Sequence, residues 1–205
     1  MKILLTGFEP FDGSTINPSA EIVQKISEDK FSDHQFIKKI LPVDNLKAVD
    51  WLENNIPHIQ PDIILHLGEA SSRPIITIEK VAINWMDFRI PDNSGKQIKD
   101  QPVVGGAPAA YFTTLPIDKI IDTVKNSGVP IDVSLSAGAY LCNQVFYTSM
   151  HLSTLFSKEC LCGFIHLPPL PEQVAYKKQY SPSMGLDLSL KAIELALAAC
   201  IGLPV

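Results

Sequence analysis

The stretch Ser134-Leu-Ser-Ala-Gly-Ala-Tyr-Leu-Cys142, followed by Asn143-Gln-Val-Phe-Tyr-Thr-Ser-Met-His-Leu152, has the pattern of a strand end, a turn and a helix. The turn contains Ala137, Gly138 and Ala139, small residues that allow backbone segments to approach closely. A strand that passes through a tight turn into a helix is the repeating unit of α/β proteins. Cys142 stands where this helix begins.

The same alternation of strand-like and helical runs continues along the whole chain. It predicts a single α/β domain, a three-layer α/β/α sandwich around a mostly parallel, mixed and twisted sheet. The expected strands are Ile3–Leu5, Phe36–Leu41, Ile63–Leu67, Ile75–Ala82, Val133–Ser136 and Gly163–Leu167. The expected helices are Pro18–Ile26, Leu46–Asn55, Ile117–Asn126, Cys142–Phe156 and a last one from about Leu186 to Cys200.

Local signals support several of these elements. Asn17-Pro18 is a strong helix start, because Asn is a good N-cap and Pro suits the first helical position. The last helix carries apolar residues at three- and four-residue spacing, which predicts one buried stripe. The segment Pro91–Ala110 is rich in Gly, Pro and Asp and is expected to form a long surface loop.

Composition limits the function. The 205 residues suit one domain, are 46% hydrophobic and 19% charged, and carry a formal charge of −5. This balance gives no basic face for nucleic acid, and no apolar run is long enough to cross a bilayer. Four cysteines without a secretion signal indicate free thiols and a cytoplasmic protein. Cys160-Leu-Cys162 lacks a partnering pair at metal-site spacing, so no metal is expected.

Cys142 is a candidate nucleophile because of its position. The positive end of a helix dipole favours the thiolate of a cysteine at the helix N-terminus. The first amides of the helix lack partners and can hold an oxyanion beside the sulfur. The alternative is that Cys142 is a buried packing residue, as most free cysteines are.

A nucleophilic thiol needs a base. The segment Cys162-Gly-Phe-Ile-His166-Leu-Pro168-Pro169 is expected to be a short buried strand that proline ends, with His166 at its carboxyl end. Ligands and catalytic groups collect at the ends of strands in open α/β sheets. His66, which ends the expected strand Ile63–Leu67, is the competing candidate.

An orienting acid is also present. Glu79 interrupts the apolar run Ile75-Ile-Thr-Ile-Glu79-Lys-Val-Ala-Ile-Asn84, and a carboxylate in such a run needs a partner. Cys142, His166 and Glu79 lie on separate segments, and they fit the roles of nucleophile, base and orienter.

The chain resembles the pyrrolidone-carboxylate peptidases, or pyroglutamyl-peptidases I, a family of cysteine peptidases. The matching stretches occur in family order over nearly the whole chain. They are Leu5-Thr-Gly-Phe-Glu-Pro-Phe11, Asn17-Pro-Ser, Glu79-Lys-Val-Ala-Ile-Asn84, Arg89-Ile-Pro-Asp-Asn-Ser-Gly95, Gly106-Ala-Pro-Ala-Ala-Tyr111, Leu115-Pro-Ile117, Ser136-Ala-Gly-Ala-Tyr-Leu-Cys142-Asn143, Gly163-Phe-Ile-His166 and Leu170-Pro-Glu-Gln173.

The resemblance implies one catalytic domain over residues 1–205 that removes N-terminal pyroglutamyl residues from peptides. It implies Cys142 as nucleophile, His166 as general base and Glu79 as orienter, with no cofactor. It also implies that Arg89 lies by the active site. The substrate-binding residues that it suggests are Phe8, Phe11 and Asn17, and the assembly that it suggests is a homotetramer.

Alternatives remain for the residues outside the triad. Phe8 and Phe11 could simply fill the core, and Arg89 could be a surface arginine paired with Asp87 or Asp92. Two other functions are open as well. One is a cysteine amidase that acts on another cyclic amide, and the other is a lactam-binding protein without activity.

The chain departs from the family pattern in three places. Asp12 stands where the family usually has a glycine, Ser71-Ser72 precede Arg73 where a glycine is usual, and Asp44-Asn45 replace apolar or aromatic residues. These departures leave the three candidate catalytic residues intact. They bear on the contacts with the substrate.

Overall fold

The structure of the protein is a computed structural model that describes residues 1–177 and 179–203. A six-stranded mixed sheet forms its centre, in the order β2-β1-β3-β8-β4-β7. The first four strands in this order run parallel, and β4 pairs antiparallel with β8. The strands are β1 (Lys2–Phe8), β2 (Gln35–Leu41), β3 (Ile63–Glu69), β4 (Ile76–Glu79), β7 (Ile131–Ser134) and β8 (Leu161–Leu167).

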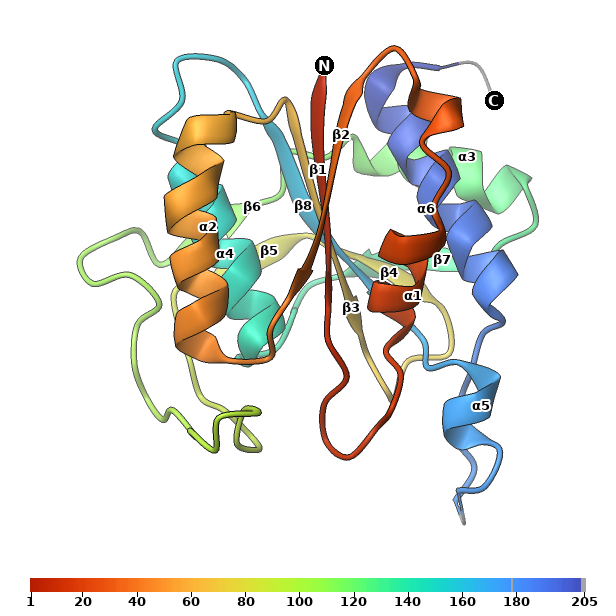
Figure 1. Ribbon diagram of the computed structural model, residues 1–205, viewed down its shortest axis with the longest axis horizontal. Helices are drawn as coiled ribbons and strands as arrows, with labels where there is room; N and C mark the ends of the chain where they lie inside the picture. Colours follow the sequence, from red (N-terminus) through yellow and green to blue (C-terminus); the bar gives the residue numbers. More distant parts are fainter. Residues whose placement is uncertain (178, 204–205) are drawn as a thin grey trace.

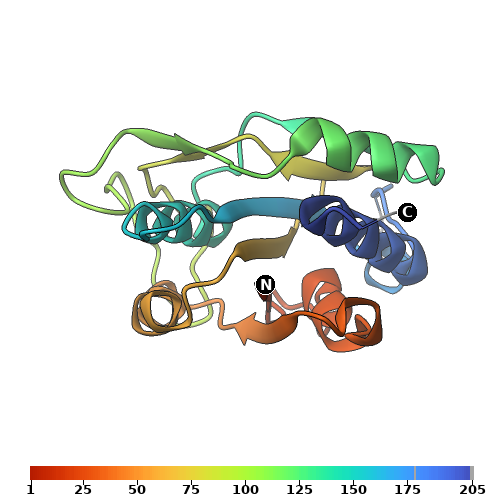
Figure 2. The same cartoon turned by 90° about the horizontal axis from the view of Figure 1, so that it is seen from above.

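Helices cover both faces of the sheet, so the predicted three-layer sandwich is confirmed (Figures 1 and 2). On one face lie α2 (Asn45–Ile59) and α4 (Leu141–Ser153), which pack against each other. On the other face lie α1 (Pro18–Lys25), α3 (Ile117–Asn126) and α6 (Leu186–Ile201). The remaining elements are short: the 3-10 helix η1 (Asp29–Phe31), α5 (Pro171–Val174) and the pair β5 (Val81–Ile83) and β6 (Ala110–Phe112).

Alternation along each strand decides which side chain meets which layer. In β8, Ile165 and Leu167 belong to the core beneath α1, α3 and α6, whereas Cys162 and Phe164 belong to the core beneath α2 and α4. His166 therefore shares the α4 face of the sheet with Phe164. This alternation brings the histidine to the same layer as Cys142.

The prediction of a single strand over Ile75–Ala82 is wrong, because two strands, β4 and β5, form there. The chain changes sheets at Lys80, between β4 and β5. The Lys80 N–H donates to Ser134 O beside β4, and its carbonyl accepts from Thr113 N beside β6. Because these two bonds point to different strands, the apolar run cannot continue in one sheet.

Other boundaries differ modestly from expectation. Helix α2 continues through Pro57 to Ile59, where Gln60 ends it in a left-handed conformation with φ 45°. The proline removes one helical hydrogen bond, but Leu52 and Ile56 still bury the apolar face of the helix. The loop expected over Pro91–Ala110 is present between β5 and β6.

Helix α2 begins with a strong N-cap. The Asp44 Oδ1 atom accepts hydrogen bonds of 3.1 Å from both Leu46 N and Lys47 N. These bonds hold the pKa of Asp44 below its usual value, although the burial of the carboxylate acts in the opposite direction. Asp44 therefore stabilises the fold through the start of α2.

We expect Asp44→Ala to lower the free energy of unfolding by about 1 kcal/mol, because two amides at the start of α2 lose their acceptor. Asp44→Asn should recover most of that loss. Urea denaturation followed by circular dichroism measures both. Asp50→Ala, an exposed change within α2, is the control. Equal losses in Asp44→Ala and Asp50→Ala would contradict the capping role.

Candidate active site

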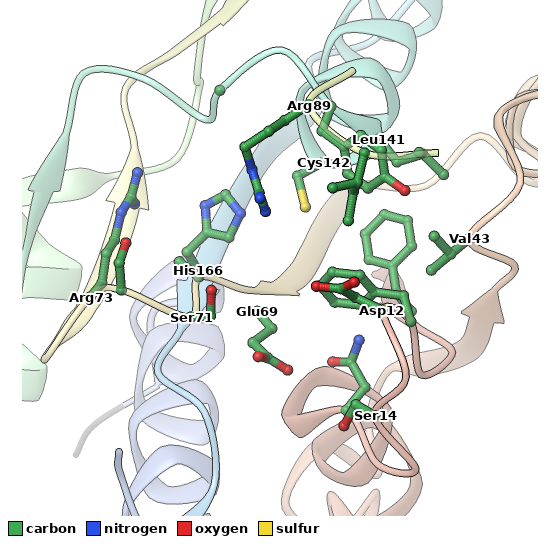
Figure 3. Close-up of a pocket in the computed structure, with 18 of the residues that line it drawn as sticks. Asp12, Ser14, Val43, Glu69, Ser71, Arg73, Arg89, Leu141, Cys142 and His166 are labelled. Carbon is green, nitrogen blue, oxygen red and sulfur yellow. The ribbon is translucent and has the colours of Figure 1, made fainter. Parts of the chain in front are cut away.

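Three elements bring Cys142, His166 and Glu79 to one cavity. Cys142 is the second residue of α4, His166 lies near the carboxyl end of β8, and Glu79 ends β4. Gly138 has a φ of 79°, a conformation that glycine adopts freely, and it lies in the turn that leads into α4. Figure 3 shows Cys142 and His166 facing the same cavity.

The register of β3 and β8 explains why the sulfur and the imidazole are neighbours. Gly68 of β3 pairs directly with His166 of β8. A Cβ atom at Gly68 would lie 3.1 Å from Cys142 Sγ and 2.7 Å from a ring carbon of Phe164. The missing side chain at Gly68 thus leaves room for the sulfur beside the histidine.

The antiparallel pairing of β4 with β8 places the carboxylate of Glu79 beside His166. Thr77 of β4 lies opposite His166, so Glu79, two residues further along, is on the same face. His166 Nδ1 donates to Glu79 Oε1 over 2.7 Å, and both side chains are buried. With Nδ1 held this way, Nε2 of His166 is the nitrogen free to act as a base.

His66 occupies the same face but lies deeper. Residue His66 of β3 pairs with Phe164 of β8, two residues before the Gly68–His166 pair on each strand. Thr6 Oγ1 lies 2.7 Å from its Nδ1 and Ser149 Oγ lies 2.8 Å from its Nε2. Burial lowers the pKa of His66 to about 3, so it stays neutral. Both nitrogens of His66 are occupied, which leaves His166 as the candidate base.

Burial opposes the thiolate that the helix N-terminus favours at Cys142. Burial, and after it the charge of Glu79, raise the pKa of Cys142 to about 12. The helix terminus favours the anion, whereas the loss of water around the sulfur favours the neutral thiol.

His166 and Glu79 have matching protonation states. Burial lowers the pKa of His166, although its hydrogen bond to Glu79 acts to raise it. Burial acts to raise the pKa of Glu79, yet the bond from His166 and further hydrogen bonds lower it overall. These shifts favour a neutral thiol and a neutral imidazole whose Nδ1–H donates to a carboxylate.

The start of α4 provides unpaired amides. The first helical bond runs from Gln144 N to Tyr140 O, so the amides of Leu141, Cys142 and Asn143 precede it. The Asn143 side chain bonds both Ile83 N and Ile83 O at 2.9 Å and so fixes α4 to β5. These amides lie beside the sulfur and suit an oxyanion.

Arg89 lies on the cavity wall, and Figure 3 shows it above the histidine. The two anionic partners considered for it have other contacts, since Asp87 pairs with Lys99 and Asp92 accepts from Asn45 N. Several hydrogen bonds hold the backbone of its segment, among them Asp87 N to Ala139 O, Tyr140 Oη to Pro91 O and Gln97 Nε2 to Arg89 O.

The loop after β1 forms the other wall of the cavity. Phe8, Phe11 and Asn17 all line it, and the cavity volume is about 550 Å³. Phe8 is buried with its ring centroid 6.4 Å from that of Phe164, whereas Phe11 is partly exposed. The amide of Asn17 caps α1 through Ser19 N and donates to Glu9 O, so its polar atoms already have partners.

Arg73 and Gln173 are among the cavity residues that the sequence did not predict. Arg73 donates to the Glu79 carboxylate and lines the cavity. A sequence signal existed, because a carboxylate in an apolar run needs a partner and Arg73 precedes that run. The amide of Gln173 donates to Glu69 Oε2 at 2.8 Å and to Ile16 O at 3.3 Å. Gln173 thereby joins the loop after β1 to the end of β3.

Comparison with known proteins identifies the family. The family model described as pyroglutamyl peptidase matches residues 1–202. The chain belongs to the pyroglutamyl peptidase family. It is 45% identical over 204 residues to the pyrrolidone-carboxylate peptidase of Pyrococcus furiosus, covering 98% of each chain. It is 42% identical over 200 residues to that of Yersinia pestis, covering 98% of this chain and 93% of the relative.

Solved structures agree with the sequence comparison. The chain superposes with a TM-score of 0.94 on a crystal structure of pyrrolidone carboxyl peptidase from Pyrococcus furiosus. The two share 44% identity, with 98% of this chain and 99% of the other covered. The predicted family and fold are therefore confirmed.

The departures from the pyroglutamyl peptidase pattern fall into two groups. Asp12, Ser71 and Ser72 line the cavity, whereas Asp44 and Asn45 do not. Asp12 has a φ of 52°, so the turn needs a left-handed residue there. Glycine adopts this conformation freely, and aspartate tolerates it.

Two further features concern metals and membranes. Across residues 1–177 and 179–203, no group of three His, Cys, Asp or Glu side chains is arranged to hold a metal ion. No helix in the same ranges is long and apolar enough to span a bilayer.

The raised pKa of Cys142 predicts how it reacts with iodoacetamide. We expect the alkylation rate of Cys142 to rise continuously from about pH 6 to about pH 9, because the thiolate fraction grows throughout this range. Peptide mass spectrometry follows the labelled cysteine, and Cys142→Ala identifies its contribution. A rate that is already constant by about pH 6 would indicate a resting thiolate and contradict the raised pKa.

Proposed function

We propose that this pyroglutamyl peptidase hydrolyses the amide bond after an N-terminal pyroglutamyl residue with Cys142, His166 and Glu79 as its catalytic triad. The observation that carries the proposal is the His166–Glu79 hydrogen bond beside a cysteine at a helix N-terminus. Such an arrangement combines nucleophile, base, orienter and oxyanion donors in one cavity. The enzyme is then a cysteine omega-peptidase.

In the first half of the reaction, Cys142 Sγ attacks the pyroglutamyl carbonyl carbon while its proton passes to His166 Nε2. The oxygen becomes an oxyanion, which the amides at the start of α4 stabilise. The bond to the leaving nitrogen then breaks, and His166 Nε2 gives its proton to that nitrogen. The shortened peptide leaves, and a thioester remains on Cys142.

In the second half, water attacks the thioester carbonyl and gives a proton to His166. The carbon–sulfur bond breaks, the proton returns to Cys142, and free pyroglutamate leaves. Glu79 holds the Nδ1–H tautomer throughout and stabilises the transient imidazolium. Burial raises the pKa of Cys142 and lowers that of His166, which favours proton transfer during the attack.

The cavity suits a flat, uncharged lactam. Phe8, Phe11 and Val43 supply apolar walls, and an N–H and a carbonyl on the ring need only a few polar partners. Arg89 contributes positive charge near the oxyanion, and Asn17 holds the loop that carries the phenylalanines. The remaining volume accommodates the peptide that follows the lactam.

The proposal also covers the domain organisation, assembly, location and partners of the protein. Residues 1–205 form the catalytic domain, which needs no cofactor and assembles as a homotetramer. All four cysteines are free thiols, which fits a protein of the cytoplasm. Its partners are peptides with N-terminal pyroglutamate, and neither nucleic acid nor a membrane is involved.

Substitutions in the triad test the mechanism. Cys142→Ala should abolish turnover of a pyroglutamyl reporter amide, because the covalent step is lost. His166→Ala should lower kcat by at least about three orders of magnitude. Glu79→Gln should lower it less, because the imidazole can still work in part. Steady-state kinetics with circular dichroism separates loss of chemistry from loss of fold.

Cys160→Ala and Cys200→Ala are the matched thiol controls and should keep most of the activity. An active Cys142→Ala would overturn the mechanism. An active His166→Ala together with an inactive His66→Ala would mean that His66 is the base.

The neutral lactam explains selectivity. An N-terminal proline or glutamine would bring an ammonium into the apolar slot, which costs several kcal/mol without a partner. We expect kcat/KM for a pyroglutamyl reporter to exceed that for prolyl and glutaminyl reporters by at least about a thousandfold. Phe11→Ala should raise KM and reduce this ratio.

Asp44→Ala is the control for the selectivity measurement, because Asp44 does not line the cavity. A wild-type enzyme that cleaves the prolyl reporter equally well would contradict the proposed lactam pocket. Preference for another cyclic amide would instead identify a different cysteine amidase, and binding without turnover would identify a lactam-binding protein.

A further inference from the structure

We propose that Arg73 is a positioning residue that fixes Glu79 and the loop before Cys142 in one arrangement. The proposal rests on the triad described above. Arg73 lies in the connection between β3 and β4, after the Ser71-Ser72 pair. Its side chain is 26% exposed and borders the cavity, and Figure 3 shows it on the far side of His166 from Cys142.

The guanidinium of Arg73 makes contacts in two directions. Its Nη1 donates to the Glu79 carboxylate and to the Thr77 hydroxyl, both on β4. Its Nη2 donates to Ser136 O over 2.8 Å. Arginine suits this position because its donors form a rigid, planar fork.

These contacts connect the acid to the nucleophile. Ser136 lies in the loop that follows β7, passes through Gly138 and enters α4 at Leu141, directly before Cys142. A shift of that loop moves the sulfur, and a shift of Glu79 moves the imidazole to which it is bonded. One side chain therefore holds both halves of the site in register, and catalysis is sensitive to such displacements.

The positive charge of Arg73 also affects the pKa of His166. His166 faces Glu79 from β4, Arg73 from the β3–β4 connection and Cys142 from α4, while Glu69 and Arg89 line the same cavity. Burial is the main reason that the pKa of His166 is low, Glu79 opposes it, and the positive charge of Arg73 lowers the pKa further. A guanidinium beside Glu79 balances the buried carboxylate and disfavours a second cation on the histidine.

The test uses Arg73→Gln and Arg73→Lys, with Lys99→Gln as the control because Lys99 forms an exposed ion pair with Asp87 outside the cavity. We expect Arg73→Gln to lower kcat for a pyroglutamyl reporter about 10- to 100-fold, with little change in KM. This is the size of the loss seen in metal sites when a residue that orients a histidine is removed. Without the guanidinium, the pKa of His166 rises, so the acidic limb of the kcat/KM profile moves to higher pH. Arg73→Lys should keep the acidic limb in place and lose less activity.

An NMR titration of labelled histidine, assigned with His166→Ala, gives a readout that does not depend on turnover. In Arg73→Gln, the His166 signal should titrate at higher pH than in the wild type. Thr77→Val removes one acceptor of Arg73 and leaves the contact with Glu79, so it should lower kcat slightly without moving the acidic limb. It also keeps the test usable if Arg73→Gln does not fold.

Three results would overturn the proposal: wild-type kcat and pH profile in Arg73→Gln, a raised KM with unchanged kcat, or lost activity with an unchanged His166 titration. The second result would make Arg73 a substrate-binding residue, and the third would give it only a structural role. Failure of the triad itself is separate, because it would appear as an active Cys142→Ala or His166→Ala.

Discussion

The carboxylate of Glu79 is fully buried, and its hydrogen bond to His166 is the interaction on which the rest of the site depends. A buried carboxylate without partners is strongly destabilising, so the fold must deliver a donor to it. The antiparallel pairing of β4 with β8 does this, because Thr77 lies opposite His166 and Glu79 follows on the same face. Reversing the direction of β4 would change the register and remove the pair.

Strand alternation sends polar groups to one face of the sheet. The face beneath α4 carries Thr6, His66 and His166 among aromatic and aliphatic neighbours. On the opposite face, β1, β3 and β8 contribute hydrophobic residues to the core, among them Leu5, Leu65 and Ile165. The deeper histidine, His66, is hydrogen-bonded through both ring nitrogens, to Thr6 of β1 and to Ser149 of α4. It thereby connects β1 and β3 to α4. The outer one, His166, bonds Glu79 through Nδ1 and lines the cavity. Two histidines of similar sequence context therefore have different surroundings, and strand register decides between them.

The chemistry of Cys142 reflects a balance between two opposing effects. The helix terminus and the positive charge of Arg73 favour the thiolate, whereas burial and the charges of Glu79 and Glu69 oppose it. Burial is the largest of these effects, so it favours the neutral thiol. A neutral thiol beside a neutral imidazole avoids the cost of separated charges in a buried site.

The sequence by itself determined the layers, the helix start at Asn17-Pro18, the candidate nucleophile with its candidate partners, and the family. These features rest on local patterns: periodicity, capping and short motifs that neighbouring residues define. Only the tertiary structure decided that the run Ile75–Ala82 changes sheets at Lys80, that His166 rather than His66 lies beside Cys142, and that Arg73 joins Glu79 to the loop before Cys142. Tertiary structure also decided that burial and the charge of Glu79 raise the pKa of Cys142. The physical reason is that register, burial and long-range charge depend on segments far apart in the chain, and no local pattern records which of them meet.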